Sequence, residues 1–432
     1  MGVRGLMPLL ARFAPKSISM PAEQDLSRWV VAVDSNIYVQ RFFRGTDGGS
    51  DEARHLRGMY NMAKYLRAMD ITPLFVFDGK ERALGKESEL AKRREDRMRI
   101  LQELERENAR ARRIHVMAGI AAQLDGGSGA TGKQAALQSE GEAAKEQPRQ
   151  ATVEWLGSRV DELTAKEQPR QITIDWRMNR LELETCRLLL FRLGALQGLE
   201  GTETASLDCT HSLHALQTHN AERTATLGRR GERLTAAKIG QCEELMRALG
   251  FATHVVDGGE SEGVCAQLCR GGVVDAVCSE DLDVVAFGGR LLRGLYSFDP
   301  RVPMALVDAE RACEELGLSR ESFVDLCILC GTDFASTIEK VGPITALRLV
   351  REHGSIEHIL ESEKFVARPG FTYELARAVF LADPASLPFA SKAQLRACTG
   401  PPDPQAVNAL LPSGAAAGPG NPDPFASGLV LV

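Results

Sequence analysis

The stretch Trp29-Val-Val-Ala-Val-Asp34 decides the fold, because it is a short β-branched run that ends in an acid. A second run, Pro73-Leu-Phe-Val-Phe, is followed by Asp78 in the same manner, and residues 55–69 between the two runs have the pattern of a helix. A strand, a helix and a strand joined by short connections form a parallel pair. We therefore predict an α/β fold with a central, mostly parallel sheet flanked by helices.

The same alternation returns after residue 234. An amphipathic helix is predicted over 235–249, and the strand-like run Gly272-Val-Val-Asp-Ala-Val-Cys leads into Ser-Glu-Asp281-Leu-Asp283. Further helical patterns cover 310–316, 322–330 and 344–352. This second stretch is therefore predicted to complete the sheet that the first one starts.

The chain between these stretches has a different composition. Residues 80–113 contain 12 Lys or Arg, 8 Asp or Glu, no proline and one glycine, which predicts a long exposed helix with a local charge of +4. Residues 114–234 hold a glycine-rich linker and an internal repeat, in which 144–155 recurs at 165–176. Two copies are too few for a self-supporting solenoid, so we interpret them as a duplicated helical insertion.

Composition thus divides the chain into four regions. The first is α/β and ends in the long charged helix, the second is the helical and low-complexity insertion, and the third is α/β again. The last is rich in Pro, Gly and Ala and is predicted to be a disordered tail. The four regions are 1–113, 114–234, 235–387 and 388–432.

The overall charge and the cysteines exclude several classes of protein. The 432 residues carry a net charge of −6, which excludes a uniformly basic nucleic-acid binder but not binding through a local basic patch. Ten cysteines in so long a chain indicate a reducing compartment. Cys327 and Cys330 form a CxxC in an apolar helix-like run without a second ligand pair, so we interpret them as buried thiols. We expect no signal peptide and no membrane span.

The most informative pattern is the position of the acids. Asp34, Asp78 and the pair Asp281/Asp283 each follow a strand-like run, and strand ends of a parallel sheet share one edge where ligand sites gather. Two more acids flank Ser261, a plausible helix cap, and another follows the helix that ends near Cys330. The seven candidates are Asp34, Asp78, Glu260, Glu262, Asp281, Asp283 and Asp333.

Seven carboxylates in one place repel one another unless cations neutralise them. Oxygen-only ligands suit Mg²⁺ or Mn²⁺, and two such ions hold the attacking and leaving oxygens of a phosphoryl transfer. Each acid taken alone is more often a turn former or a helix cap. The metal hypothesis therefore depends on the whole set converging, which the sequence does not settle.

These residues resemble a known family, the structure-specific 5′ nucleases, and most closely its flap endonuclease branch. The resemblance is carried by Met1-Gly-Val-Arg-Gly-Leu, Val31-Ala-Val-Asp34-Ser, Phe75-Val-Phe-Asp78-Gly-Lys, Glu89-Leu-Ala-Lys-Arg-Arg-Glu, Ser279-Glu-Asp281-Leu-Asp283 and Phe323-Val-Asp-Leu-Cys-Ile-Leu-Cys-Gly-Thr-Asp333. It covers about 1–113 and 235–387. It implies the family's PIN-like 5′-nuclease fold, with a helical arch and a helix–hairpin–helix motif.

The resemblance also implies roles for single residues. The seven acids match the family's metal ligands, and Lys86 and Arg93 match arch residues that act on the scissile phosphate. These two lie seven residues apart and so share a helix face, although a solvated surface would explain either one alone. The positions expected to contact DNA are Gly2, Tyr38, Arg44, Lys340 and Gly342.

Two departures from the family pattern stand out. The hairpin that grips duplex backbone reads Lys340-Val-Gly342-Pro343-Ile-Thr-Ala346, without the first glycine and both basic residues of the family motif. The following helix N-terminus still offers backbone N–H groups to a phosphate. We find no sliding-clamp motif at the end of the chain.

We interpret the sequence as that of a Mg²⁺-dependent DNA endonuclease and 5′-exonuclease that cleaves 5′ flaps in replication and repair. It implies two Mg²⁺ ions, with Mn²⁺ as a substitute, DNA with a flap or junction as the substrate, and, by resemblance alone, a nuclear location. The alternative is a nucleic-acid-binding adaptor with weakened catalysis, in which the insertion 114–234 binds a protein partner. A ribonuclease of the related α/β fold is disfavoured by the arch and hairpin motifs.

Overall fold

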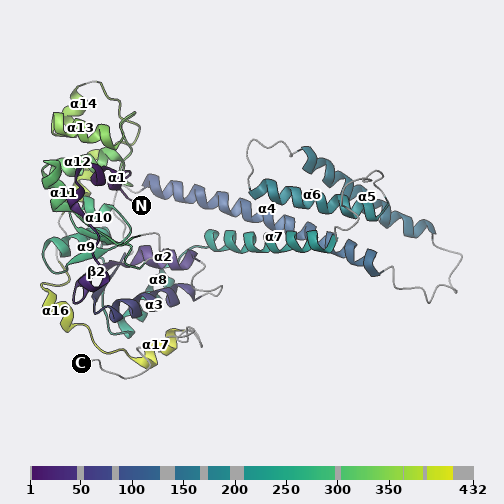
Figure 1. The fold of residues 1–432 in the computed structure, drawn as a ribbon, viewed down its shortest axis with the longest axis horizontal. Coiled ribbons are helices and arrows are strands. Elements are labelled where there is room, and N and C mark those ends of the chain that lie inside the picture. Colours follow the sequence, from purple (N-terminus) through teal and green to yellow (C-terminus); the bar gives the residue numbers. More distant parts are fainter. Residues whose placement is uncertain are drawn as a thin grey trace. The chain divides into compact units, whose positions relative to one another are not determined.

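The computed structural model describes most of the chain. The described residues are 2–45, 53–79, 87–126, 142–165, 174–194, 209–296, 303–362, 364–382 and 387–411. They form two compact units, one made of 1–94 with 233–432 and the other of 95–232 (Figure 1). We call them the sheet unit and the helical unit and describe each by itself. Across the described residues, no helix is both long and apolar enough to cross a membrane.

The sheet unit is built on seven strands in the order β1-β7-β6-β5-β2-β3-β4. The five neighbours from β6 to β4 are parallel, and β7 pairs antiparallel with both β6 and β1. The α/β, mostly parallel architecture is thus confirmed. The strands are β1 (Ile18–Ser19), β2 (Val30–Asp34), β3 (Thr72–Phe77), β4 (Ala252–Val255), β5 (Ala276–Cys278), β6 (Arg290–Arg293) and β7 (Ala305–Asp308).

Both sides of β2 are buried, because helices cover both faces of the sheet. Val31 and Val33 pack on one face with α2, α3, α8 and α17, whereas Val30 and Ala32 pack on the other with α1 and α9 to α16. This alternation follows the two-residue period of a strand. The helices are α1 (Leu6–Phe13), η1 (Pro15–Ser17), η2 (Glu23–Leu26), α2 (Ser35–Arg44), α3 (Arg54–Ala68), α8 (Ala236–Ala248), α9 (Ser261–Arg270), α10 (Asp283–Ala286), α11 (Ala309–Leu316), α12 (Arg320–Cys330), α13 (Pro343–His353), α14 (Ile356–Glu361), α15 (Tyr373–Leu381), α16 (Lys392–Ala397) and α17 (Pro404–Leu410).

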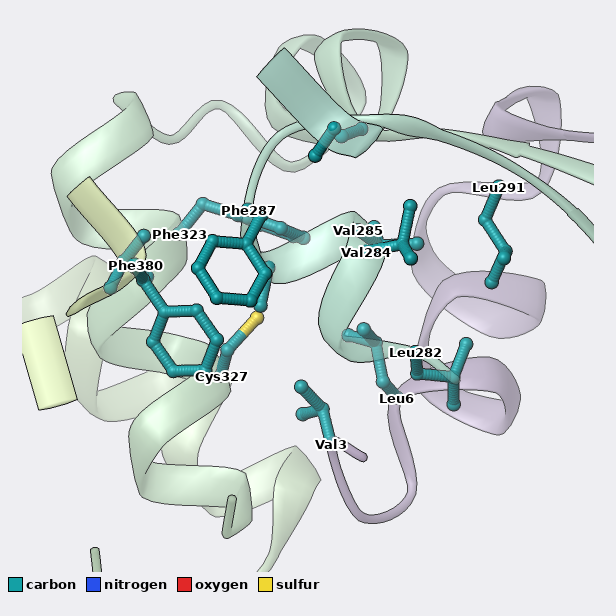
Figure 2. Packing of buried hydrophobic residues seen from close by; sticks show 14 of the residues in the cluster. Val3, Leu6, Leu282, Val284, Val285, Phe287, Leu291, Phe323, Cys327 and Phe380 are labelled. Atoms are coloured by element: carbon teal, nitrogen blue, oxygen red, sulfur yellow. The ribbon is translucent and has the colours of Figure 1, made fainter. Parts of the chain in front are cut away.

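The second face carries the core that anchors the acidic loop after β5. Leu282 and Val284, on either side of Asp283, belong to one buried cluster with Val3 and Leu6 of the N-terminal segment (Figure 2). The apolar flanks therefore fix the backbone that carries the acid. Cys327 lies in the same cluster, and both it and Cys330 are buried, which confirms the prediction of buried thiols.

The C-terminal region corrects one prediction. The tail was predicted to be disordered from residue 388, but α16 and α17 lie within it. Asp403 caps α17 by accepting hydrogen bonds from two backbone N–H groups, and its own N–H donates to the carbonyl of Ala248 at the end of α8. Val407 completes the attachment by packing into the core beside α8. Residues 412–432 lie outside the described part.

Within the described part of the helical unit, four helices share one apolar core. They are α4 (Glu87–Gly126, which begins in the sheet unit), α5 (Glu142–Ala165), α6 (Ile174–Arg192) and α7 (Cys209–Gly231) (Figure 1). Their apolar core includes Ile114, Met117, Leu156, Leu189 and Leu216. The long charged helix is confirmed from Glu87 onward. The sequence places a region boundary in this helix after residue 113, whereas the second compact unit begins at residue 95.

Candidate metal centre

The sheet brings three predicted acids to one edge. Asp34 is the last residue of β2, Asp78 directly follows β3, and Asp281 lies three residues beyond β5. Because β5, β2 and β3 are adjacent and parallel, their carboxyl ends meet at the same edge. The prediction that separate segments deliver carboxylates to one place is therefore confirmed for these three.

Hydroxyl and amide donors hold the acids at that edge. The Ser279 hydroxyl donates to Oδ2 of Asp34 over 2.9 Å, and the Ser261 hydroxyl donates to Oδ1 over 3.2 Å. The backbone N–H of Ser261 donates to Oδ1 of Asp78 over 3.3 Å, and the Asn36 amide donates to the other oxygen of that carboxylate. The start of α9 thus bridges the ends of β2 and β3.

Ser261 was predicted to cap α9, and this was wrong. Glu260 occupies the N-cap position with extended backbone, and its side chain does not cap the helix. Ser261 is the first helical residue, and its hydroxyl is turned to Asp34 instead. Glu262 follows in the first turn. Glu260 and Glu262 therefore flank the residue that touches both Asp34 and Asp78.

Asp281 and Asp283 lie against the N-terminal segment. The backbone N–H of Asp283 donates to Oδ1 of Asp281 over 3.1 Å, and both side chains are buried. A Cβ atom built on Gly2 would lie 2.0 Å from Oδ1 of Asp281 and 2.7 Å from Oδ1 of Asp283. Only a residue without a side chain fits there, and its φ of 77° also favours glycine. Gly2 therefore lies directly against the acids.

The electrostatics of this edge show a shortage of positive charge. Asp34 is only 2% exposed. Its burial, together with repulsion from Asp78 and Asp281, raises the pKa of Asp34 to about 7, although the hydrogen bonds from Ser279 and Ser261 oppose that rise. A bound cation would reverse the balance by favouring the ionised form.

The donor chemistry fits a hard divalent cation, since all seven candidate ligands offer carboxylate oxygens. However, no three acidic, histidine or cysteine side chains among the described residues enclose one point in the manner of a metal shell.

Arg93 lies beside the seventh acid. Its guanidinium is 3.8 Å from Oδ2 of Asp333, and the Arg93 side chain is 48% exposed. The arginine expected to act on a phosphate therefore stands next to a candidate metal ligand and remains accessible to solvent. Lys86, the other residue with this expected role, lies outside the described residues.

The residues expected to contact DNA fall into two groups. Tyr38 is wholly buried, with its hydroxyl 3.2 Å from Sγ of Cys278, so its assignment as a DNA contact is corrected. It faces the core because α2 packs this side against the sheet. Arg44, Lys340 and Gly342 are exposed, and Gly342 is the N-cap of α13.

Comparisons with known proteins agree with this geometry. The XPG N-terminal domain model matches residues 1–100, and the XPG I-region model matches residues 253–333. Together the two matches cover every candidate acid. Over these two parts the chain is similar to the XPG family.

Curated proteins are similar to this chain over part of their length. Flap endonuclease 1 of Aspergillus niger is 40% identical over 175 residues, which are 39% of this chain and 44% of that protein. Flap endonuclease 1-A of Sorghum bicolor is 38% identical over 181 residues, which are 40% and 47% of the two chains. The chain thus spans a little under half the length of the curated relatives it matches.

The fold itself extends over more of the chain. The catalytic core of Rad2, solved with a DNA substrate, is similar with a TM-score of 0.51 over 95% of this chain and 94% of that one, at 14% identity. At this identity the likeness establishes the 5′-nuclease fold alone.

Sequence reasoning missed several residues of this site. Ser279 was quoted only as part of a motif, Asn36 was not noticed, and Ser261 was given another role. Each lies within two residues of a candidate acid, where a hydroxyl or amide was the available signal. Each side chain, however, donates to a candidate acid that is distant in sequence, so its partner could not be read from the local pattern.

Proposed function

We propose that the chain is a divalent-metal-dependent DNA nuclease that hydrolyses a phosphodiester at a 5′ flap or at a junction between duplex and single strand. The observation that carries this proposal is the burial of Asp34 beside Asp78 and Asp281 at one sheet edge. A protein does not retain such mutual repulsion for stability, so the cluster is best explained by a cation that it binds in use.

The proposed cofactor is a pair of Mg²⁺ ions, with Mn²⁺ as a substitute. The seven acids would hold them, with Asp34 oriented by Ser279 and Ser261 and with Asp78 oriented by Asn36. When bound, Mg²⁺ would lower the pKa of water and stabilise negative charge on the phosphate. Gly2 keeps the approach to Asp281 and Asp283 free of side-chain atoms.

Other residues would bind the phosphate and the DNA. Arg93 stands close enough to Asp333 to place its guanidinium on the scissile phosphate, and Lys86 is assigned the same role by resemblance. The exposed N-terminus of α13 at Gly342 offers backbone N–H groups to a duplex phosphate. Lys340 and Arg44 add exposed positive charge.

The names of two relatives, Flap endonuclease 1 and Flap endonuclease 1-A, support a flap as the substrate. Replication and repair are proposed as the setting by resemblance. A nuclear location rests on the same likeness. We also propose the division of the chain into four regions, 1–113, 114–234, 235–387 and 388–432. None of the seven acids belongs to the second region.

The test is cleavage of a labelled 5′-flap substrate with Mg²⁺ and with EDTA. We expect cleavage with Mg²⁺ only, and Asp281→Asn should abolish it while leaving flap binding largely intact. The matched control is Glu280→Gln, because Glu280 is the neighbouring acid but pairs with Arg293 and accepts the Gly294 N–H. Flap binding without cleavage by the wild type would favour the adaptor alternative. Wild-type turnover by Asp281→Asn would overturn the metal assignment.

A further inference from the structure

The helical unit contains a cavity of about 500 Å³ that is separate from the acidic sheet edge. All four helices contribute to its wall, with side chains from α4, α5, α6 and α7. A volume of this size is typical of small-molecule sites. The only apolar side chain of the lining is Ala109, and no aromatic ring is present in it.

Arginines dominate the wall. Five arginines and three glutamates line it, a net charge of +2, which the buried Glu182 behind the lining reduces to +1. Three of the arginines come from one face of α4 at helical spacing. The arginines are Arg106, Arg110, Arg113, Arg159 and Arg223.

Four of these guanidiniums are held in place by carboxylates. Glu182 accepts hydrogen bonds from Arg110 over 3.2 Å, from Arg113 over 2.6 Å and from Arg159 over 2.8 Å. Arg223 lies 3.0 Å from Glu107. These contacts fix the positions of the arginine heads before any ligand arrives, which lowers the entropy cost of binding.

The fifth arginine differs from the other four. Arg106 is exposed and lines the cavity, and within the described part of the chain it makes no ion pair or hydrogen bond. Its charge is therefore available to a ligand without breaking an existing contact.

We propose that this cavity binds a small anion that carries two or more phosphate groups. Guanidinium groups recognise phosphate oxygens by charge-assisted, bidentate hydrogen bonds, and the fixed arginines form a preorganised set of donors. A nucleobase has no ring to stack on in this wall. Placing one buried and three half-buried arginines here only to join helices is a poor means of stabilisation, because apolar residues of similar volume often do as well or better.

The experiment is isothermal titration calorimetry of the full chain with inorganic pyrophosphate. EDTA keeps divalent cations from the acidic edge, and sodium chloride holds the ionic strength constant. We expect saturable one-to-one binding that Arg106→Gln weakens about 10-fold, since one hydrogen bond to a charged group is lost. Arg106 is exposed, so this variant should fold as the wild type does.

Arg112→Gln is the matched control, because Arg112 lies on the same helix, is exposed and does not line the cavity. It should bind pyrophosphate like the wild type. Equal weakening by both variants, or no saturable binding by the wild type, overturns the proposal. A short oligothymidylate is titrated as well. If it displaces pyrophosphate at equal phosphate concentration, the site serves a DNA strand and the small-anion assignment is wrong.

Discussion

Two buried carboxylates, Asp34 in the sheet unit and Glu182 in the helical unit, have opposite surroundings. Asp34 accepts hydrogen bonds from two hydroxyls and lies beside other acids, so burial and repulsion raise its pKa to about 7. Burial also acts to raise the pKa of Glu182, but hydrogen bonds and charge from Arg113 and Arg159 outweigh it and the pKa is lowered. Both side chains are almost fully excluded from solvent.

The difference separates a charge that supports the fold from a charge that serves a ligand. Glu182 is neutralised inside its own unit, so its ionised form contributes to the native state. Asp34 is opposed by its neighbours, so its ionised form costs stability unless a cation is supplied. The repulsion that the protein retains around Asp34 therefore points to binding of a cation, and the pairing of Glu182 points to a structural role for that carboxylate.

The largest expected effect comes from neutralising Asp34. Asp34→Asn keeps the size of the side chain and should reduce flap cleavage by at least about 10³-fold, because several kcal/mol of charge stabilisation depends on the metal. In EDTA at neutral pH the same variant should have a higher Tm than the wild type, since a repulsive charge is removed. Cleavage assays and differential scanning calorimetry measure the two effects.

Mg²⁺ provides the internal control for that variant. It should raise the Tm of the wild type by mass action and raise the Tm of Asp34→Asn much less. If Asp34→Asn melts at a lower temperature than the wild type in EDTA, then Asp34 supports the fold as Glu182 does, and the comparison fails.

The second-largest expected effect comes from Arg93, whose guanidinium lies beside Asp333. Arg93→Ala should lower kcat by roughly 10²–10³, the size seen when one preorganised electrostatic donor is removed. Single-turnover cleavage at saturating enzyme separates this from binding. Arg99→Ala on the same helix is the control, because Arg99 is exposed and, among the residues that the structure describes, its one ion pair is with Asp96, one turn away. A change confined to KM would show that Arg93 only binds DNA.

The sequence predicted the sheet edge because its signals are local. Runs such as residues 30–33 are β-branched and short, and acids that follow parallel strands meet at one edge whatever the rest of the chain does. The position of Asp34 and Asp78 was therefore accessible without a structure. The folded segment 392–410 was not, because its short helices depend on tertiary packing. α17 packs on α8, and α16 packs through Leu395 into the core on the other face of the sheet.

Side-chain orientation was also beyond the sequence. Tyr38 and Arg44 lie on the same helix, yet one is buried and the other exposed, and only the packing of α2 on the sheet decides which. Glu107 and Glu182 lie in helices full of charges, and nothing near them in sequence shows that they are buried. Their burial depends on arginines that include Arg113, 69 residues from Glu182.

The third prediction tests the paired side of the comparison. Glu182→Gln should destabilise the helical unit by about 3 kcal/mol, because it leaves buried arginines without their counter-charge. Urea unfolding is followed by tryptophan fluorescence in a Trp29→Phe background, where the remaining Trp155 and Trp176 both belong to the helical unit. Glu184→Gln is the control and should cost less than about 0.5 kcal/mol, because Glu184 forms an exposed pair with Arg180.

The smallest expected effect is the pH dependence of the stability difference between the wild type and Glu182→Gln. The folded pKa of Glu182 lies below its ordinary value of 4.5, so its stabilising contribution is complete above pH 4.5 and is lost as the pH falls through the folded pKa. Protonated Glu182 is uncharged, as the glutamine is. The stability gap between the wild type and Glu182→Gln should therefore narrow as the pH falls from about 5.5 to about 3.5. Urea unfolding of the same Trp29→Phe proteins at both pH values measures the gap. If the stability difference between the wild type and Glu182→Gln instead widens as the pH falls, the charge of Glu182 does not stabilise the four helices. The proposed contrast between Glu182 and Asp34 would then be wrong.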